Sequence, residues 1–241
     1  MRLALALCVL LATSFLMACD VDEENAITGS GDLITEEYEF EDFTSVELSS
    51  AFDADISFAD SFSVSLEVDD NVLELVEVTE DGDTLQFRLA PPSSTRRVTL
   101  RATITMPELS SLDLSGASHA TVTGFENAES LDAVLSGASR LDGVLDVVHS
   151  DFRLSGASKV SVTGGGTEAD LEASGASTLD LADFSLEIAH VNLSGASNGT
   201  VNVRDELGPV VVSGASHLRY VGQPTLTGVD SSGASTIDPA D

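Results

Sequence analysis

The chain has 241 residues, of which 41 are acidic and only 10 are lysine or arginine, so its formal net charge is −31 at pH 7. This excess of negative charge disfavours anionic lipid surfaces as partners, and we expect no nucleic-acid partner. A single lysine, Lys159, among so many acids fits a saline habitat, and fits equally well the need of an extracellular protein to stay in solution.

The N-terminus has the pattern of an export signal. Arg2 is followed by an apolar run that ends at Ala18, directly before Cys19. The run is too short, and Asp20 ends it too abruptly, for a membrane-spanning helix. A small residue before a cysteine is typical of a bacterial lipoprotein, so we expect residues 1–18 to be a signal peptide and Cys19 to carry a lipid. The lipid would hold the protein in the cell envelope, on its periplasmic face or at the cell surface; an ordinary signal peptide is the alternative.

The mature chain begins with two segments of different character. Residues 19–32 are acidic and contain glycine and serine without apolar periodicity, which is typical of a flexible tether. Residues 33–107 contain short runs of alternating apolar and polar residues, with Asp81 and Gly82 as a tight-turn signal between two of them. We expect this second segment to form an N-terminal β-strand region that continues into the rest of the fold. With one cysteine in the signal and the other lipidated, no disulfide is expected.

One helical turn is predicted within the N-terminal region. The polar residues Asp69, Asp70 and Asn71 precede the apolar segment 72–75, an order typical of a capped helix start. No longer helix is indicated, so the predicted fold class is all-β.

The second half of the chain contains seven copies of Ser-Gly-Ala-Ser, which follow one another at intervals of 21, 19, 19, 20, 19 and 19 residues. A fixed repeat of about 20 residues is too short for a pair of helices and matches one coil of a solenoid. We therefore expect residues 108–241 to form a single-stranded parallel β-helix, with a right-handed coil as the usual sense of parallel crossovers. The glycines expected at the tight corners are Gly116, Gly137, Gly156, Gly175, Gly195, Gly214 and Gly233.

An alignment of the copies on their glycines supports this interpretation. Positions four and two residues before the glycine, and four and six residues after it, are apolar in nearly every copy, whereas the positions between them are polar. The exceptions are Gly143, Gly199 and Ser231 at the apolar positions, and Val134 and Val211 at the polar positions. Alternation on both sides of the glycine predicts two short strands per coil, with every second side chain inside. We also expect the serine hydroxyls of the motif to pass hydrogen bonds from coil to coil.

Three kinds of segment occur in a fixed order: SVELSSAFDADISF, then DDNVLELVEVTEDGDTLQFRL, then TITMPELSSLDLSGAS with its repeats. In this order, over about Phe43 to Asp238, the chain resembles the DUF2807 family, described as a "putative autotransporter adhesin head domain" or GIN domain. The resemblance implies a parallel β-helical fold on bacterial envelope proteins and suggests adhesion. It carries over no catalytic or binding residue.

The position three residues after each glycine gathers hydrogen-bond donors along one stripe of an otherwise acidic molecule. The residues are His119, Arg140, Lys159, Asn198 and His217. A linear anionic glycan is the ligand that such a stripe would bind. The alternative is that these side chains only offset neighbouring acids and discourage aggregation.

Parallel β-helices also include enzymes that act on polysaccharides with pairs of carboxyl groups. The candidates here are Asp142, Asp180 and Asp238, five residues after a glycine. The nearest two lie two coils apart, about 10 Å, which is too far for a retaining pair and at the limit for an inverting pair. We therefore do not expect an enzyme, and since the histidines follow no metal-ligand spacing, we expect no metal and no cofactor.

These observations favour a lipid-anchored envelope solenoid that acts as an adhesin-like binding module. A polysaccharide-acting enzyme and a passive envelope scaffold are the alternatives.

Overall fold

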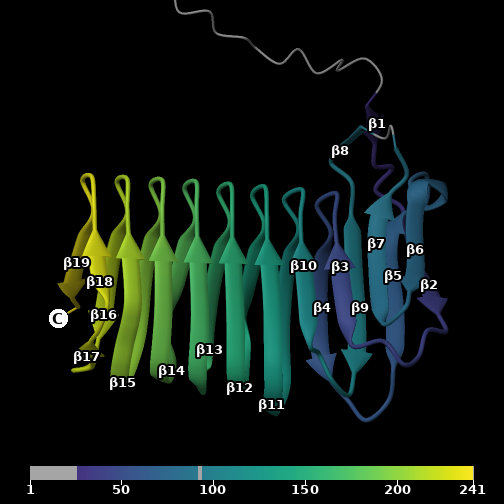
Figure 1. Ribbon diagram of the computed structural model, residues 1–241. Coiled ribbons are helices and arrows are strands. Elements are labelled where there is room, and N and C mark those ends of the chain that lie inside the picture. The colour runs from purple at the N-terminus through teal and green to yellow at the C-terminus, as the bar shows by residue number, and fades with distance from the viewer. Residues whose placement is uncertain (1–25, 92–93, 241) are drawn as a thin grey trace, which may run out of the picture.

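The computed structural model describes residues 26–91 and 94–240. They form one elongated body in which β-strand coils are stacked along a single axis, with the N-terminal strands at one end and the C-terminus at the other (Figure 1). All but two of the strands belong to one 17-stranded sheet. The expected all-β parallel solenoid is confirmed. The predicted signal peptide, residues 1–18, and Cys19 lie outside the described residues.

Seven tight turns divide the repeat region into coils. Its strands are β10 (Ser111–Leu114), β11 (His119–Leu135), β12 (Arg140–Leu154), β13 (Lys159–Ala173), β14 (Thr178–Leu193), β15 (Asn198–Val212), β16 (His217–Val221), β17 (Thr225–Leu226), β18 (Val229–Ser231) and β19 (Thr236–Pro239). The first half of β11 pairs with β4 (Asp53–Phe58) and its second half pairs with β10, so the strand passes from one face of the solenoid to the other. The pairings within this region are parallel and join residues one repeat apart, such as Arg140 and Lys159.

The two faces of the solenoid enclose the core. We call the strand segments that approach a tight turn the pre-turn face, and those that leave it the post-turn face. At the four predicted apolar positions the side chains point inward: Leu112, Leu114, Ala120 and Val122 of the first repeat coil are fully buried. The last coil is the exception, because no described coil covers it and Val229 is 48% exposed. The alternating pattern therefore predicts the core correctly except at the open end.

Two glycines interrupt the apolar pattern for steric reasons. A Cβ at Gly199 would lie 3.1 Å from Leu193 and 3.3 Å from Leu218, whose side chains fill its place. A Cβ at Gly143 would lie 2.2 Å from the carbonyl oxygen of Val122 in the preceding coil, where the register of β11 and β12 shifts. Both exceptions follow from packing within the same fold.

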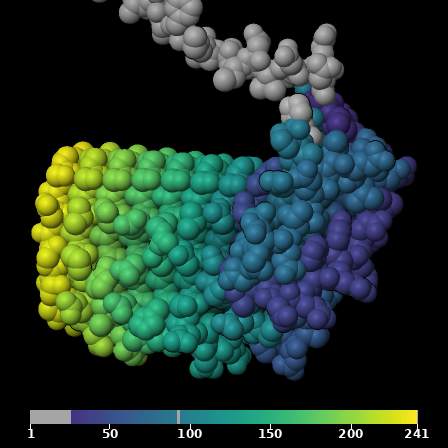
Figure 2. Space-filling view, turned by 45° about the vertical axis from the view of Figure 1, so that its right-hand side comes forward, coloured from purple at the N-terminus to yellow at the C-terminus, as the bar shows by residue number. Residues whose placement is uncertain are grey.

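The Ser-Gly-Ala-Ser segments are the tight turns. Each motif glycine has a positive φ between 62° and 77°, a region that glycine enters without steric cost. From the third turn on, backbone hydrogen bonds join one turn to the next; the Ala176 N–H, for example, donates to the Gly156 carbonyl oxygen at 2.7 Å. Successive turns therefore lie directly on one another and form an even ridge along one edge of the molecule (Figure 2).

The serine hydroxyls form the expected hydrogen bonds from coil to coil only at some turns. The second serine of a turn donates to the first serine of the same turn, as the Ser177 hydroxyl does to the Ser174 carbonyl oxygen at 2.8 Å. Most bonds to the preceding coil come from the first serine and are longer, as between Ser174 Oγ and the Leu154 carbonyl oxygen at 3.3 Å. In the last turn the Ser235 hydroxyl also donates to the Val212 carbonyl oxygen, at 2.9 Å. The prediction is confirmed only in part, because the turn also brings a nearer acceptor, three residues back, within reach of the buried hydroxyl.

The N-terminal strands continue the stack, but not in chain order. They are β1 (Ile27–Thr28), β2 (Leu33–Tyr38), β3 (Ser45–Leu48), β5 (Ser63–Asp69), β6 (Val76–Asp81), β7 (Thr84–Leu89), β8 (Thr95–Arg96) and β9 (Leu100–Met106). β3 pairs in parallel with both β7 and β10, and β4 with both β9 and β11. The coil made by β3 and β4 therefore lies between the coil of β7 and β9 and the first repeat coil. The antiparallel strands β2, β5 and β6 lie at this end of the stack (Figure 1).

A buried carboxylate ties the first described residues to this end. Asp69 is only 1% exposed and accepts hydrogen bonds from the backbone N–H of Thr99 at 2.7 Å and of Gly31 at 2.6 Å. These two bonds, first that from Thr99, lower the pKa of Asp69 below its ordinary value. The carboxylate thus favours the folded arrangement in its ionised form.

Two expectations about this region need correction. The tether predicted for residues 19–32 does not extend over Ile27–Thr28, which forms β1 and pairs with β8. The helical turn predicted after Asn71 exists as the 3-10 helix η2 (Leu73–Leu75), but no side chain caps it. Asn71 instead donates from its amide to the Thr28 carbonyl oxygen at 2.9 Å, and so serves the attachment of β1. None of the described residues forms a helix that could cross a membrane.

Candidate functional site

The structure sets the candidate ligand residues in one row on the post-turn face. Each lies three residues after a turn glycine, and parallel pairing places the residues of successive coils side by side. Neighbours in such a row are about 4.8 Å apart along the solenoid axis. We call this row the donor stripe, and it consists of His119, Arg140, Lys159, Asn198 and His217, with Thr178 in the fourth repeat coil.

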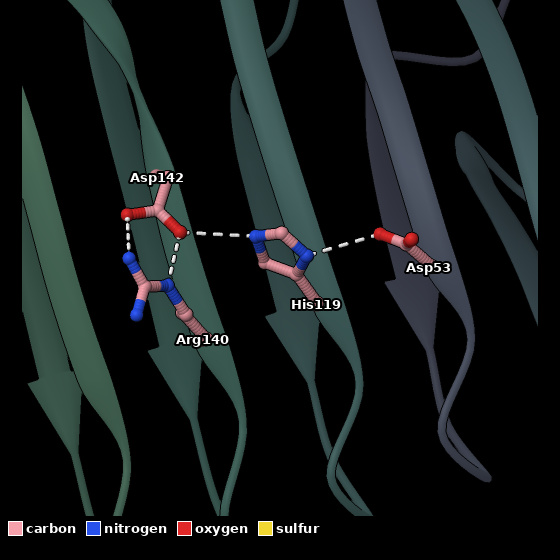
Figure 3. A network of polar contacts seen from close by, with 4 residues as sticks. All are labelled: Asp53, His119, Arg140 and Asp142. Carbon is pink, nitrogen blue, oxygen red and sulfur yellow. Dashed lines mark hydrogen bonds and ion pairs between the residues drawn. The ribbon is translucent and has the colours of Figure 1, made fainter.

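The first two members of the donor stripe belong to a polar network with two carboxylates (Figure 3). His119 Nδ1 is 3.0 Å from Asp53 Oδ1, and its Nε2 is 3.0 Å from Asp142 Oδ2. Arg140 donates from Nη2 to Asp142 Oδ1 at 2.6 Å, and its Nε contacts the other oxygen of the same carboxylate. Asp53 comes from β4, so the network joins the N-terminal region to the first two repeat coils.

The network also shifts the pKa values of two of its members, Asp142 and Arg140. The hydrogen bond from Arg140, and after it that from His119, lowers the pKa of Asp142, while the bond to Asp142 raises the pKa of Arg140. Asp142 is therefore held as a carboxylate that accepts hydrogen bonds.

The remaining members of the donor stripe make fewer side-chain hydrogen bonds and ion pairs. Among the described residues, neither Lys159 nor Asn198 makes a side-chain hydrogen bond or ion pair. His217 Nδ1 lies 3.0 Å from Thr236 Oγ1 in the last coil. Within the described residues, the unpartnered members of the donor stripe named here are thus Lys159 and Asn198, on the C-terminal side of Arg140.

The structure does not bring the candidate catalytic carboxylates together. Asp142 and Asp180 are separated by the coil that carries Ser161, so they lie two coils apart, about 10 Å. Asp238 is three coils beyond Asp180. Within residues 26–91 and 94–240, no group of three or more histidine, cysteine or acidic side chains is arranged to hold a metal ion.

The pre-turn face carries a cluster of charged side chains that is not among the site residues predicted from the sequence. Arg153 Nη2 is 2.6 Å from Asp132 Oδ2, and Nη1 contacts Asp151. Nearby, burial, followed by the charges of Glu47 and Asp132, raises the pKa of Asp113. These residues lie three or five positions before a turn glycine or pair with such positions. The alignment on the glycines therefore shows the charged residues, at the polar positions before the turn.

The family comparison agrees with the fold. The model of the DUF2807 family, described as "Putative auto-transporter adhesin, head GIN domain", matches residues 42–224. No curated protein matches the chain.

Several solved structures share the architecture. A "putative adhesin" from Bacteroides fragilis has a TM-score of 0.81 at 18% identity and covers 89% of this chain and 100% of its own. A "putative adhesin" from Parabacteroides merdae has a TM-score of 0.69 at 15% identity, covering 90% and 99%. A "putative lipid binding protein" from Parabacteroides distasonis has a TM-score of 0.70 at 15% identity, covering 90% and 100%. At these identities the likeness shows the fold alone. The family model, by contrast, spans well over half of the sequence, and the chain therefore belongs to the DUF2807 (GIN domain) family.

Proposed function

We propose that this protein is an adhesin-like binding module of the bacterial cell envelope, anchored by a lipid on Cys19, that meets its ligand with the post-turn face. The adhesin description of the family supports an exported, envelope-associated protein. The apolar run that ends in Ala18 before Cys19 supports the lipid anchor.

The observation that carries the binding role is the partly free donor stripe. Lys159 and Asn198 have no partner within the described residues, and they stand one and three coils beyond Arg140 in the same row. Arg140 is 49% exposed and uses two of its nitrogens on Asp142, so the third nitrogen can still face a ligand. A row of donors at coil spacing suits an extended anionic glycan, because such a chain presents acidic groups repeatedly along its length.

Charge reversal on the donor stripe tests this proposal. Arg140→Glu with Lys159→Glu should weaken retention on immobilised heparin, and adhesion to glycan-bearing cells, by at least about tenfold. The matched control is Arg88→Glu with Arg204→Glu, which changes the net charge equally at exposed positions outside the stripe. Equal losses in both double variants, or no loss in the first, would refute a ligand site on the stripe.

The same assay separates the alternatives. Release of shortened glycan by the wild-type chain would favour a polysaccharide-acting enzyme. Failure of the wild-type chain to bind any glycan or cell would favour a passive scaffold.

The lipid anchor has its own test. Cys19→Ala should move the protein from the membrane fraction to the soluble fraction and abolish incorporation of a radiolabelled fatty acid. A Cys19→Ala protein that stays in the membrane fraction would contradict the anchor.

A further inference from the structure

Two shallow depressions run along the pre-turn face on either side of one row of side chains. One has a volume of about 340 Å³ and lies next to the tight turns, and the other, of about 380 Å³, lies on the far side of the row. Both depressions are lined by Arg153, Glu172 and Asn192, which we call the axial row. Outward side chains on a strand recur at every second residue, about 6.6 Å, which leaves such troughs between neighbouring rows.

Two members of the axial row are available to a ligand. Glu172 and Asn192 are paired residues on adjacent coils, and both side chains are exposed. Within the described residues, neither side chain makes a hydrogen bond or an ion pair. Arg153 is held by Asp132 and Asp151, so it is fixed in place beside them. The row therefore offers a free carboxylate and a free amide next to an oriented guanidinium.

The walls of the depressions add further hydrogen-bond donors and acceptors. On the side of the second depression, His190 Nδ1 lies 2.8 Å from Asp170 Oδ1. The first depression is bordered by turn hydroxyls from three successive coils, Ser155, Ser174 and Ser194. Closely spaced donors and acceptors fit a ligand rich in hydroxyl groups, because each hydroxyl both donates and accepts.

Other classes of ligand fit this surface less well. On this face the carboxylates of Asp151, Asp170 and Glu172 would repel an anionic chain. An extended peptide has no free strand edge to join here, because β13 and β14 pair with one another and with the coils on either side. Among the described residues there is also no group suited to a metal ion.

We infer that the axial row is a second ligand site, for an extended neutral oligosaccharide that lies parallel to the solenoid axis. Glu172 accepts hydrogen bonds from the hydroxyls of one sugar unit, and Asn192 donates to and accepts from the next unit. Arg153 donates to a ring or hydroxyl oxygen at the other end of the row. The site lies on the opposite face from the donor stripe and takes a ligand of different charge, so either one can fail without the other.

Titration of the full chain with four neutral hexasaccharides tests the inference: cellohexaose, xylohexaose, mannohexaose and maltohexaose. At least one of them should bind with a dissociation constant below about 1 mM. Glu172→Ala with Asn192→Ala should weaken that binding at least about tenfold. Both side chains are exposed and unpartnered within the described chain, so the melting temperature should not change.

The control is Lys159→Ala with Asn198→Ala, which removes the free part of the donor stripe and should leave neutral-sugar binding unchanged. The inference is overturned if none of the four sugars binds at about 1 mM, or if the Glu172 and Asn192 variant binds as tightly as the wild-type chain. Loss of heparin binding by the control variant alone would bear on the proposed function and not on the axial row.

Discussion

The turn between β3 and β4 occupies the same place in the stack as the Ser-Gly-Ala-Ser turns, yet it reads Ser49-Ser50-Ala51-Phe52. Ser50 and Ala51 both have positive φ, of 62° and 65°, and the first repeat turn repeats this pattern at Gly116 and Ala117. In the six later turns only the glycine has a positive φ. The first two turns therefore resemble type I′ and the later turns type II′, in which the first central residue alone is left-handed.

The neighbours of these turns explain why glycine is absent from one and present in the others. A Cβ at Gly175 would lie 2.4 Å from the carbonyl oxygen of Gly156 in the preceding turn, whereas a Cβ at Gly116 would lie 3.0 Å from the Ser50 nitrogen. Ser50 itself is preceded in the stack by the longer connection between β7 and β9. A left-handed turn therefore tolerates serine or alanine, whereas close stacking on an identical turn requires glycine.

The largest loss of stability is expected from a substitution that disrupts the stacking of the turns. Gly175→Ala adds a Cβ against backbone that cannot move aside, in addition to the cost of its φ of 75°, and should destabilise the fold by about 3 kcal/mol or more. Gly116→Ala has a similar φ but a looser contact, and should cost about 1–2 kcal/mol. Urea denaturation of both variants measures the difference, and equal losses would mean that the turn conformation alone demands glycine.

An effect of intermediate size is expected in the pH dependence of stability, which should differ between Asp69 in the N-terminal region and Asp113 in the repeat region. The pKa of Asp69 is lowered by the N–H groups of Thr99 and Gly31, so its contribution to stability is present above the ordinary pKa of a carboxyl, about 4, and is lost as the pH falls through the lowered pKa. Asp113 has the opposite sign: its raised pKa means that its contribution is present at low pH and is lost as the pH rises through the raised value.

The variant that tests this contrast is Asp69→Asn, which cannot ionise. Its stability should fall less steeply with acid than that of the wild-type chain when urea midpoints are compared below about pH 4. Asp113→Asn should change the acid dependence in the other direction. Identical acid profiles for the wild-type chain and Asp69→Asn would show that the buried carboxylate does not contribute.

A smaller effect concerns the last residue of the turn, which is serine in the repeats and Phe52 in the turn between β3 and β4. Ser177→Ala leaves the Ser174 carbonyl oxygen without its 2.8 Å donor in a buried site and should cost about 1 kcal/mol. Ser174→Ala removes only a long contact of 3.3 Å and should cost less. Thermal denaturation of the two variants checks the order, and the reverse order would favour a ladder between coils.

The smallest effect is expected at the turn without glycine. Ser50→Gly removes a side chain from a residue with a φ of 62° and should change stability by less than about 1 kcal/mol, with a slight gain where relief of strain exceeds the added freedom of the unfolded chain. A loss of several kcal/mol would show that the Ser50 side chain supports the stack.

The sequence predicts the repeat coils well because a marker glycine and a period of two together fix which side chains face inward. Leu112 and Leu114 are buried as predicted. The position of the β3–β4 coil could not be predicted in the same way, since its turn lacks the marker and Val46 pairs with Leu112 far along the chain. Chain order alone suggests that it would precede the coil of β7 and β9.

The sequence predicts that the residues of the donor stripe lie in one row, but it does not predict their hydrogen-bond partners. The repeat places His119, Arg140 and Lys159 in one row, as the structure shows. The partner of His119 on one side is Asp53, which the fold brings from the N-terminal region through the pairing of β4 with β11. The axial row was not predicted because its residues share no chemical type, and we infer a site there only from the depressions beside them.

Amide hydrogen exchange tests the stacking of the turns most directly. Ala157, Ala176, Ala196 and Ala215 lie in exposed turns, yet each donates its N–H to the glycine carbonyl oxygen of the preceding turn at 2.7–2.8 Å. Their amides should therefore be protected to the level of the core strands. The amides of Ala117 and Ala138 donate to no preceding turn within the described part of the chain and should exchange fast. Fast exchange at all six alanines would contradict the account, because it would mean that the tetrapeptides are separate loops and not turns stacked on one another.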